Sequence, residues 1–437
     1  MELTQNLWER YGFTDNPYDT KALSLSKAAP LSVQDAYVER DISSSASRLL
    51  MNFLRNPGGG RMVVEGEPGV GKTTFVNYHR QLWESSKDHR LLSPLTEISV
   101  REEWGERDFL LSLLASLSAR LRLEMGEKAF DKNKILRKIT AITGVHVEKG
   151  HGFSGSISVI GTGGGFGRTS NSSVKVGEVT NDQLRELLSG LIALIQTRGF
   201  SGVVFHLDNL ELLARRTPEK LRDFFENIRD VLQEPGAYFV FVGYEGMFQQ
   251  VIIPLPRVRS IFFDTPVHLE PLSHEAVRKV MEKRYALLAV PRMQWIKPVD
   301  YDVVFYLYET FSGKIRYVMN AITSLISHLP DSYAQPLGLE DAQAGLHEIV
   351  FGELKRTLHG MELEVFLAAV RQRRFTNSSL AATMGKSKQQ IQKYLKNWVD
   401  LCLAAHAEKE GRNQFYEVDP RFLVLNESPT NQENGNG

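Results

Sequence analysis

Residues 66–73 combine glycines, a lysine and a threonine at the spacing of a loop that holds a chain of phosphates. The stretch is Gly-Glu-Pro-Gly-Val-Gly-Lys-Thr, which satisfies the P-loop pattern G-x-x-x-x-G-K-T. Glycines let such a loop curl so that its main-chain N–H groups point at phosphate oxygens, and the following helix adds its positive end. Lys72 can reach the β- and γ-phosphates, and the Thr73 hydroxyl can bind Mg²⁺. The predicted cofactor-binding residues of this loop are Gly66, Glu67, Pro68, Gly69, Val70, Gly71, Lys72, Thr73 and Thr74.

A carboxylate for the same metal ion follows a hydrophobic run at residues 203–207. Asp208 ends this run, and ligands of open α/β sheets bind outside the carboxyl ends of the strands. Mg²⁺ prefers hard oxygen ligands such as hydroxyls and carboxylates. Thr73 and Asp208 are therefore the predicted metal ligands, and ATP and Mg²⁺ are the predicted cofactors.

The residue after Asp208 bears on the rate of ATP hydrolysis. Many P-loop ATPases place a glutamate there to orient the attacking water, whereas this chain has Asn209. Asn209 itself, or Glu211 two residues further on, could orient the water less directly. The sequence therefore predicts an ATPase whose hydrolysis is slow or stimulated by a partner.

The elements around the loop alternate between strands and helices. A β-branched run at 61–65 precedes the loop and a helix at 74–83 follows it, as the motif requires. Further strands are expected at 95–100, 203–207 and 238–242. Further helices of this region are expected at 42–54, 108–123, 182–197 and 218–232. Alternating strands and helices imply a parallel sheet with helices on both faces.

Residues 128–180 are interpreted as an insertion in this core. Glycine recurs between residues 150 and 167, and short β-branched runs at 157–160 and 174–176 predict a loose hairpin. A surface excursion is the simplest interpretation. A second phosphate-binding nest, or a loop that contacts nucleic acid or a partner, is the alternative.

After residue 273 the pattern becomes helical. Helices are expected at 274–285, 302–310, 314–328 and 339–358, and then at 363–371, 377–384 and 387–399. Gly385 separates the last two helices, as in a helix-turn-helix, with Thr376 or Asn377 capping the first and Ser387 the second. Runs at 403–407 and 414–418 are expected to pair as a hairpin around residues 408–413, which would form a wing.

The last of these helices has two different faces. At about 100° per residue, Ile391, Tyr394, Leu395 and Trp398 share one face. The other face, together with the residues just before the helix, carries amides and ammonium groups. The amides can pair with adenine edges, and the ammonium groups can neutralise phosphate. The predicted DNA-binding residues are Lys386, Lys388, Gln389, Gln392, Lys393 and Lys396.

Charge is distributed unevenly along the chain. Lys+Arg and Asp+Glu are both 52 of the 437 residues, so the net charge is zero and no global field attracts nucleic acid or membrane. Residues 365–399 contain seven Lys or Arg and no Asp or Glu, so the remainder sums to −7. This local patch favours duplex DNA as a partner. Winged helices also serve as protein-interaction modules, and that alternative stays open.

The remaining composition bounds the class of protein. The length predicts two or three domains. One cysteine excludes an internal disulfide and fits a reducing compartment. No secretory signal and no run of about 18 apolar residues is present. A cytoplasmic protein, nucleoid- or nucleus-associated, without membrane partners is the expectation.

With these residues described, the chain resembles the AAA+ ATPases, and among them the initiator group of origin-recognition ATPases and their bacterial relatives in transposition regulation and defence. Residues 37–41 (Tyr-Val-Glu-Arg-Asp) resemble the segment that lines the adenine pocket, which implies contacts from Val38 and Arg40. Residues 269–273 resemble the junction into a helical lid. Residues 312–316 (Ser-Gly-Lys-Ile-Arg) resemble the sensor-2 motif, which implies that Arg316 acts on the γ-phosphate.

The resemblance also has departures and consequences. After the strand at 238–242 the expected polar sensor residue is absent, and Gly-Tyr-Glu stands at 243–245. Arg257 and Arg259 are candidates for an arginine finger that enters a neighbouring subunit's site, which would couple hydrolysis to homo-oligomer assembly. An exposed basic loop is the alternative interpretation of these two arginines.

Together these features predict an α/β P-loop NTPase of AAA+ type, followed by a helical lid and a C-terminal winged helix. The predicted segments are 1–60 (N-terminal), 61–270 (core with the insertion 128–180), 271–360 (lid), 361–425 (winged helix) and 426–437 (disordered tail). The predicted function is an ATP-driven switch that binds DNA and recruits partner proteins. The alternative is a signal-transduction or anti-phage defence switch, whose winged helix binds protein and whose effector is a separate chain.

Overall fold

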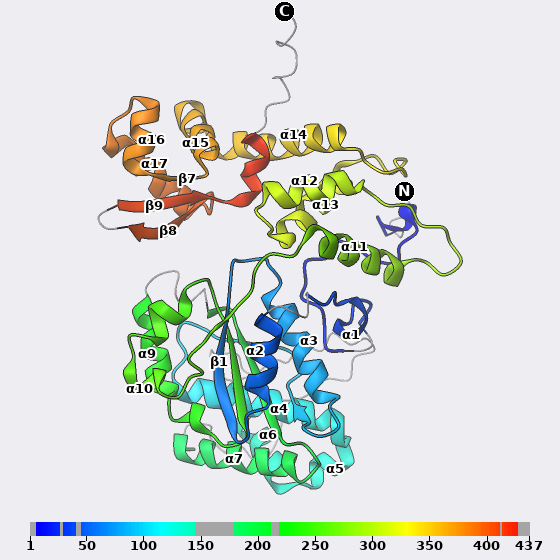
Figure 1. Ribbon diagram of the computed structural model, residues 1–437, viewed down its shortest axis with the longest axis vertical. Coiled ribbons are helices and arrows are strands. Elements are labelled where there is room, and N and C mark those ends of the chain that lie inside the picture. The colour runs from blue at the N-terminus through cyan, green and yellow to red at the C-terminus, as the bar shows by residue number, and fades with distance from the viewer. Residues whose placement is uncertain are drawn as a thin grey trace, which may run out of the picture. The chain divides into compact units, whose positions relative to one another are not determined.

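The computed structural model describes residues 6–26, 29–40, 45–144, 179–210, 218–410 and 413–426. The chain divides into two compact units (Figure 1). The α/β unit is Ala22–Leu272. The helical unit combines Met1–Lys21 with Ser273–Gly437.

One parallel sheet forms the centre of the α/β unit. Its strands in the described residues are β1 (Gly59–Glu65), β2 (Leu91–Leu92), β3 (Ile98–Ser99), β4 (Gly202–Asp208), β5 (Ala237–Val242) and β6 (Val267–His268). The order across the sheet is β2-β4-β5-β1-β6, with β3 also paired to β4, and every pair is parallel. β5 therefore lies between the strand that enters the P-loop and the strand that ends at Asp208.

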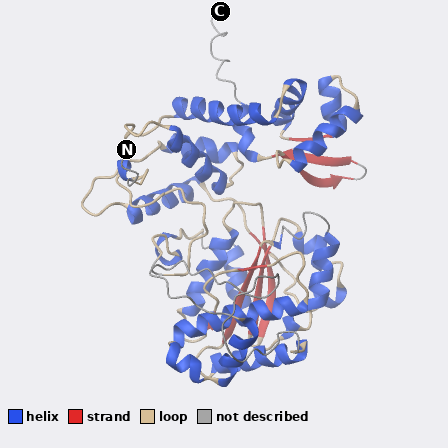
Figure 2. Cartoon of the chain, turned by 180° about the vertical axis from the view of Figure 1, so that it is seen from behind, coloured by secondary structure: helices blue, strands red, loops and turns tan. Residues whose placement is uncertain are grey.

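Helices cover both faces of this sheet (Figure 2). Alternate residues of β5 enter two different cores, as strand geometry requires. Tyr238, Val240 and Val242 pack with the helices α2 (Ser45–Leu54) and α3 (Lys72–Glu84). Phe239 and Phe241 pack on the other side, whose helices are α4 (Glu106–Met125), α7 (Asn181–Gln196), α9 (Pro218–Ile228) and α10 (Pro256–Arg259). Burial on both faces explains why these strands are continuous apolar runs.

The expected insertion begins later than residue 128. Residues 127–143 form α5 (Glu127–Lys132) and α6 (Lys134–Thr143), and their apolar side chains are buried in the same core as α4 and α7. The prediction is therefore wrong for 128–144, because Phe130, Leu136 and Ile139 recur at helical spacing and need that core. The predicted hairpin at 157–160 and 174–176 lies outside the described residues. The strand expected at 95–100 is also shorter, since only Ile98–Ser99 pair with β4.

The N-terminal 60 residues do not form one segment. Phe13 forms a bridge with Ala289, and Tyr18 Oη lies 2.6 Å from Tyr285 Oη, so the first 21 residues belong to the helical unit. Residues from Ala22 onward, including α1 (Val33–Ala36), belong to the α/β unit. The expected boundary at residue 60 is wrong because burial of the aromatic residues near the start requires an apolar partner, which the helical unit supplies.

The helical unit contains a lid-like helical region and a winged helix. The first part comprises α11 (His274–Leu288), α12 (Tyr301–Thr310), α13 (Ile315–His328) and α14 (Leu339–Thr357). The second part follows the order α15 (Gly360–Gln372), β7 (Arg374–Thr376), α16 (Asn377–Met384), α17 (Lys388–Asp400), β8 (Ala404–Glu410) and β9 (Asn413–Val418). These last strands form an antiparallel sheet, β7-β9-β8. The predicted fold class, an α/β P-loop core followed by helices and a winged helix, is confirmed.

Three details of the winged helix were not predicted. β7 is only three residues long, and its Arg-Phe-Thr sequence carries no alternation that would reveal a strand. The wing strands are longer than the expected runs, because β8 extends to Glu410. After β9 the chain forms a 3₁₀ segment, Pro420–Asn426, whose residues Phe422–Leu425 are buried.

Candidate functional site

The loop between β1 and α3 has the backbone that its glycines allow. Gly66, Gly69 and Gly71 have φ values of 152°, 87° and 96°, in the region that favours glycine. A Cβ at Gly66 would lie 2.6 Å from the Leu269 carbonyl oxygen, so the loop passes close to the backbone that follows β6. α3 then begins at Lys72, which places its N-terminus beside the loop.

The two predicted metal ligands meet in space although 135 residues separate them. Thr73 Oγ1 donates a hydrogen bond to Asp208 Oδ2 at 2.6 Å. Asp208 is 7% exposed, at the carboxyl end of β4, so both oxygens lie at the edge of the sheet where the loop lies. A hydroxyl and a carboxylate are the hard oxygen donors that suit Mg²⁺. The residues present therefore fit this ion.

Lys72 lies inside the loop that precedes it. Its Nζ donates to the carbonyl oxygens of Gly66, at 2.8 Å, and Glu67, at 3.0 Å, and the residue is 8% exposed. The ammonium group therefore occupies the centre of the cradle. The next residue, Thr74, has a different environment, because its Oγ1 accepts from Leu23 N at 3.3 Å.

Asn209, directly after Asp208, is fixed by hydrogen bonds from its side chain and its main chain. Its side-chain Nδ2 donates to Ser99 Oγ at 2.8 Å, and its main-chain N–H donates to Asp208 Oδ1 at 2.8 Å. Its φ of 64° is left-handed, a conformation that asparagine tolerates better than most residues. A carboxamide cannot act as a general base. Glu211 lies outside the described residues.

The first residue of the turn after β5 is a glycine, Gly243. A Cβ at Gly243 would lie 2.3 Å from Met247 Sδ, so any side chain at this position would require Met247 to shift. Glu65 at the end of β1 supports this turn instead, since it accepts from Phe248 N at 3.1 Å. Burial raises the pKa of the Glu65 carboxyl. Glu245, in the same turn, lies 3.9 Å from His268 Nε2.

The predicted adenine segment lies against the P-loop. Arg40 donates through Nη2 to the Val70 carbonyl oxygen at 2.5 Å and through Nη1 to the Glu270 carbonyl oxygen. Tyr37, three residues earlier, stacks on Tyr78 of α3 with ring centroids 4.0 Å apart. Val38 is buried. Arg40 therefore links the loop to the residues after β6, and contact of Val38 and Arg40 with a nucleotide stays a prediction.

The three remaining arginines are not joined to this cluster by any described contact. Arg257 and Arg259 lie on α10 and are exposed, with Arg259 Nε 3.9 Å from Asp264 Oδ1. The Arg257 carbonyl oxygen accepts from Arg229 Nε at 3.2 Å. Arg316 is exposed at the second position of α13, in the helical unit. Their predicted roles stay predictions.

Sequence reasoning missed three polar residues behind Asp208. Asn77 and Arg80 of α3 and His206 of β4 are buried and joined by hydrogen bonds. The available signal was a histidine in the middle of the apolar run 203–207, where burial of a polar ring requires partners.

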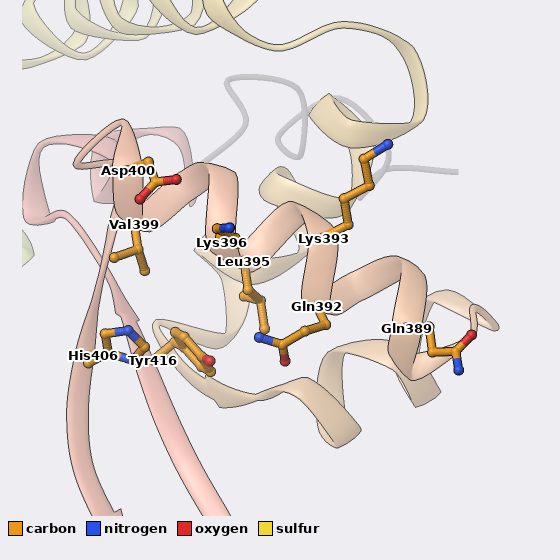
Figure 3. A pocket seen from close by; sticks show the side chains of 9 residues that line it. All are labelled: Gln389, Gln392, Lys393, Leu395, Lys396, Val399, Asp400, His406 and Tyr416. Carbon is orange, nitrogen blue, oxygen red and sulfur yellow. The ribbon is translucent and has the colours of Figure 1, made fainter.

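A second candidate site lies on the winged helix. The expected faces of α17 are confirmed, because Ile391, Leu395 and Trp398 are buried whereas Gln392, Lys393 and Lys396 are exposed. A hollow of about 440 Å³ lies between α17 and the wing strands (Figure 3). Its lining residues are Gln389, Gln392, Lys393, Leu395, Lys396, Val399, Asp400, His406 and Tyr416.

The cations of this surface face solvent. Lys388, Lys393 and Lys396 are exposed and Lys386 is half-buried, and none of the four forms an ion pair within the described ranges. Gln392 is partly engaged, since its Oε1 accepts from Asn377 Nδ2 at 2.8 Å. Asp400 is the acidic member of the hollow and opposes anion binding at that end.

Within the described residues, no helix is both long enough and apolar enough to span a bilayer.

No protein-family model matches this chain, and no curated protein matches its sequence. Solved structures similar to it include two from Aeropyrum pernix: the ORC1 protein in complex with DNA (14% identity, 91% of this chain and 94% of that chain covered, TM-score 0.44) and the ORC2 protein with ADPNP and ADP (13% identity, 94% and 96%, TM-score 0.45). A third is CDC6P from Pyrobaculum aerophilum (14% identity, 90% and 95%, TM-score 0.38). The fold described above rests on the chain's own strand order and contacts, and not on these likenesses.

Proposed function

We propose that this protein is an ATP-binding switch of AAA+ type that hydrolyses ATP slowly and binds duplex DNA through its winged helix. The observation that carries the first part is the convergence of the P-loop hydroxyl and the strand carboxylate, with Thr73 Oγ1 2.6 Å from Asp208 Oδ2. Glycines with left-handed backbone and the N-terminus of α3 complete an anion cradle beside them.

Each residue of the cradle has a defined task. The main-chain N–H groups of residues 69–73 and the Lys72 ammonium bind phosphate oxygens. Thr73 and Asp208 would hold Mg²⁺, which supplies positive charge to the phosphates when it is bound. Arg40 positions the loop through its hydrogen bond to Val70. We assign Val38 and Arg40 to the adenine end of the nucleotide.

Slow hydrolysis follows from the residues around Asp208. Asn209 stands where many P-loop ATPases have a glutamate, and its side chain donates to Ser99 Oγ. The first residue after β5 is Gly243, which has no polar side chain. We therefore expect the purified protein without partners to turn over well below roughly 10 s⁻¹, the typical enzyme median. A coupled phosphate-release assay measures this rate. Turnover above that value would contradict the proposed slow hydrolysis.

The exposed arginines provide a link to assembly. We place Arg316 as the residue that responds to the γ-phosphate, and Arg257 or Arg259 as the group inserted into the site of a second copy of this chain. Their exposure makes them accessible to a phosphate or to a neighbouring subunit. Sedimentation with ATP, ADP or no nucleotide tests the homo-oligomer, because only ATP should drive it.

DNA binding is supported by the lysines of the α16–α17 region, which face solvent without described ion pairs. If four of them contact phosphates, the slope of log K against log salt is about −0.9 × 4. Raising salt from about 50 mM to about 200 mM should then weaken binding to duplex DNA about 100-fold. A fluorescence-anisotropy titration of the full chain measures this, and a salt-independent affinity would contradict phosphate contact.

The alternative function is a signalling or defence switch whose winged helix binds protein. It predicts no binding to duplex DNA in the same titration. Asp400 in the hollow is the observation that favours it, since a carboxylate suits a protein partner better than a phosphate backbone. Comparing ATPase activity with and without duplex DNA separates the two functions. Stimulation by DNA supports the DNA-binding switch, and no binding and no stimulation supports the alternative.

A further inference from the structure

Gln392 lies on the exposed face of α17 and lines the hollow of the winged helix (Figure 3). α17 is the second helix of the α16–α17 pair and begins at Lys388, so Gln392 is close to its N-terminus. In a helix-turn-helix the second helix enters the major groove, and the residues near its N-terminus contact the base edges. Gln392 is therefore placed to contact a base if this surface binds duplex DNA.

A side chain of the preceding helix holds the Gln392 amide. Asn377, the first residue of α16, donates through Nδ2 to Gln392 Oε1 at 2.8 Å. The same Nδ2 donates to the main-chain carbonyl oxygen of Lys388 at 3.1 Å. An amide NH2 group carries two hydrogens, so both bonds form at once. Asn377 is half-buried, and its two bonds join the start of α16 to the first turns of α17.

The direction of both amides follows from the Lys388 carbonyl oxygen. This oxygen only accepts hydrogen bonds, so the Asn377 group that faces it must be the NH2. The reverse orientation would place two oxygens together, and it would bury the NH2 at the Oδ1 position, which has no hydrogen-bond partner among the described residues. Because Nδ2 only donates, the Gln392 atom beside it must be the carbonyl oxygen.

Gln392 therefore presents a donor to a ligand. Its Oε1 faces Asn377, whereas its Nε2 forms no hydrogen bond with the described residues. The paired contact of glutamine with adenine needs both ends of the amide to face one base, since the amide donates to N7 and accepts from N6. Guanine instead presents two neighbouring acceptors, N7 and O6, in the major groove. An amide that offers only its NH2 group matches guanine.

Gln389 is the contrasting residue on the same helix. It is exposed, lines the same hollow, and its amide forms no hydrogen bond with the described residues. Both ends of that amide stay available, which is what the paired contact with adenine requires. The two glutamines of this surface thus differ in the chemistry that they offer to a base.

We propose that Gln392 contacts guanine in the major groove through its NH2 group alone, and that Asn377 is the positioning residue that sets this preference by holding Oε1. The inference rests on the proposed function, because a base preference exists only if the winged helix binds duplex DNA. Pairing with adenine, which the sequence predicts for the amides of this helix, is then left to Gln389.

A purely structural role for Asn377 makes a different prediction. Its bond to the Lys388 carbonyl oxygen already joins α16 to α17, so removing the side chain lowers stability. Such a loss weakens binding to every DNA sequence by the same factor, because the contacts made by the folded helix stay the same. The base preference at one position changes only if Asn377 also controls which end of the Gln392 amide reaches the DNA.

The test selects bound duplexes from a randomised DNA library with the full chain at about 50 mM salt, where phosphate contacts are strong. Fluorescence anisotropy then measures the affinity for each single-base change in the selected site. Gln392→Ala identifies the position that Gln392 contacts, since the preference there disappears. Asn377→Ala removes the group that holds Oε1. Asn397→Ala is the matched control, because Asn397 lies on the same helix and donates to Glu362 Oε1 at 2.8 Å.

We expect wild type to prefer guanine over the other bases at the identified position by about 5-fold or more. Asn377→Ala frees Oε1 for the paired contact, so adenine should become the preferred base there by a similar factor. Asn397→Ala should keep the wild-type preference.

Asn377→Asp gives a second measurement if the alanine variant does not fold. A carboxylate only accepts hydrogen bonds, so it should turn the Gln392 NH2 group toward itself and leave Oε1 facing the DNA. The preferred base should then be one that offers a donor in the major groove, which is adenine or cytosine. The extra negative charge weakens binding to all sequences, and the ratio between bases is unaffected by it.

The inference is overturned if the position identified by Gln392→Ala is not guanine in wild type, if the Asn377 variants keep guanine there, or if Gln392→Ala changes no position. Wild type that binds duplex DNA without any base preference also overturns it, and leaves the proposed DNA binding intact. Wild type that binds no duplex DNA rejects the proposed DNA binding itself, and the inference falls with it. The wild-type titration alone distinguishes these failures.

Discussion

Replacing Lys72 with alanine should weaken ATP binding about 100-fold. The ammonium group occupies the centre of the P-loop, within 3.0 Å of the Gly66 and Glu67 carbonyl oxygens, and it is nearly buried. Charge-assisted hydrogen bonds to phosphate contribute about 1.5 to 3 kcal/mol each, and about 3 kcal/mol corresponds to a loss of about 100-fold in affinity. Isothermal calorimetry with Mg-ATP measures the change directly.

Lys87→Ala is the control for this experiment. Lys87 lies just after the same helix, is exposed, and carries the same charge. Its removal tests whether a general loss of positive charge weakens nucleotide binding, and we expect no change. If Lys72→Ala binds Mg-ATP as tightly as wild type, the phosphate site is assigned to the wrong loop, and the proposed function loses its basis.

The sequence predicted the parts of the site that depend on short-range patterns. The P-loop is a continuous stretch that satisfies the whole G-x-x-x-x-G-K-T pattern, and Asp208 ends a largely apolar run that forms the buried strand β4. The parallel order of the sheet then brings Thr73 and Asp208 together, as expected. Both predictions required only local pattern and one rule of sheet topology.

The parts that the sequence did not reveal depend on contacts between distant segments. Asn77, Arg80 and His206 are unremarkable individually, and only the packing of α3 on β4 joins them. The first 21 residues join the helical unit through aromatic contacts such as Tyr18 with Tyr285, across 267 residues. The start of the insertion was predicted too early in the chain. No break in composition separates α5 and α6 from the glycine-rich stretch that follows them.

A second prediction concerns stability and uses His79, the buried histidine of α3. His79 is 1% exposed, with Nδ1 2.9 Å from the Phe75 carbonyl oxygen. Burial lowers its pKa to about 4, and the hydrogen bond to Phe75 opposes that shift only partly. An unfolded histidine has a pKa of about 6.5, so the unfolded chain binds the proton first as the pH falls. Stability is therefore complete above about pH 6.5 and is lost as the pH falls toward about 4.

The size of this loss of stability follows from the difference between the folded and unfolded pKa values of His79. At about 1.4 kcal/mol per unit, the free energy of unfolding should fall by about 3 kcal/mol between about pH 7 and about pH 4 on account of His79. Urea unfolding of wild type and of His79→Phe at both pH values isolates this contribution, because the other titrating groups, including His206, are common to both proteins and cancel in the difference.

His359→Phe provides the comparison that makes the result specific. His359 is exposed before α15, and its replacement should leave the pH dependence of unfolding as in wild type. His79→Phe should instead reduce the fall in the free energy of unfolding between about pH 7 and about pH 4. The stability of this variant relative to wild type should therefore rise as the pH falls. Equal slopes for wild type and His79→Phe would show that the ring is charged or solvated in the folded protein. The packing of α3 against the sheet would then be looser than its burial indicates, and water would reach the helix that follows the P-loop.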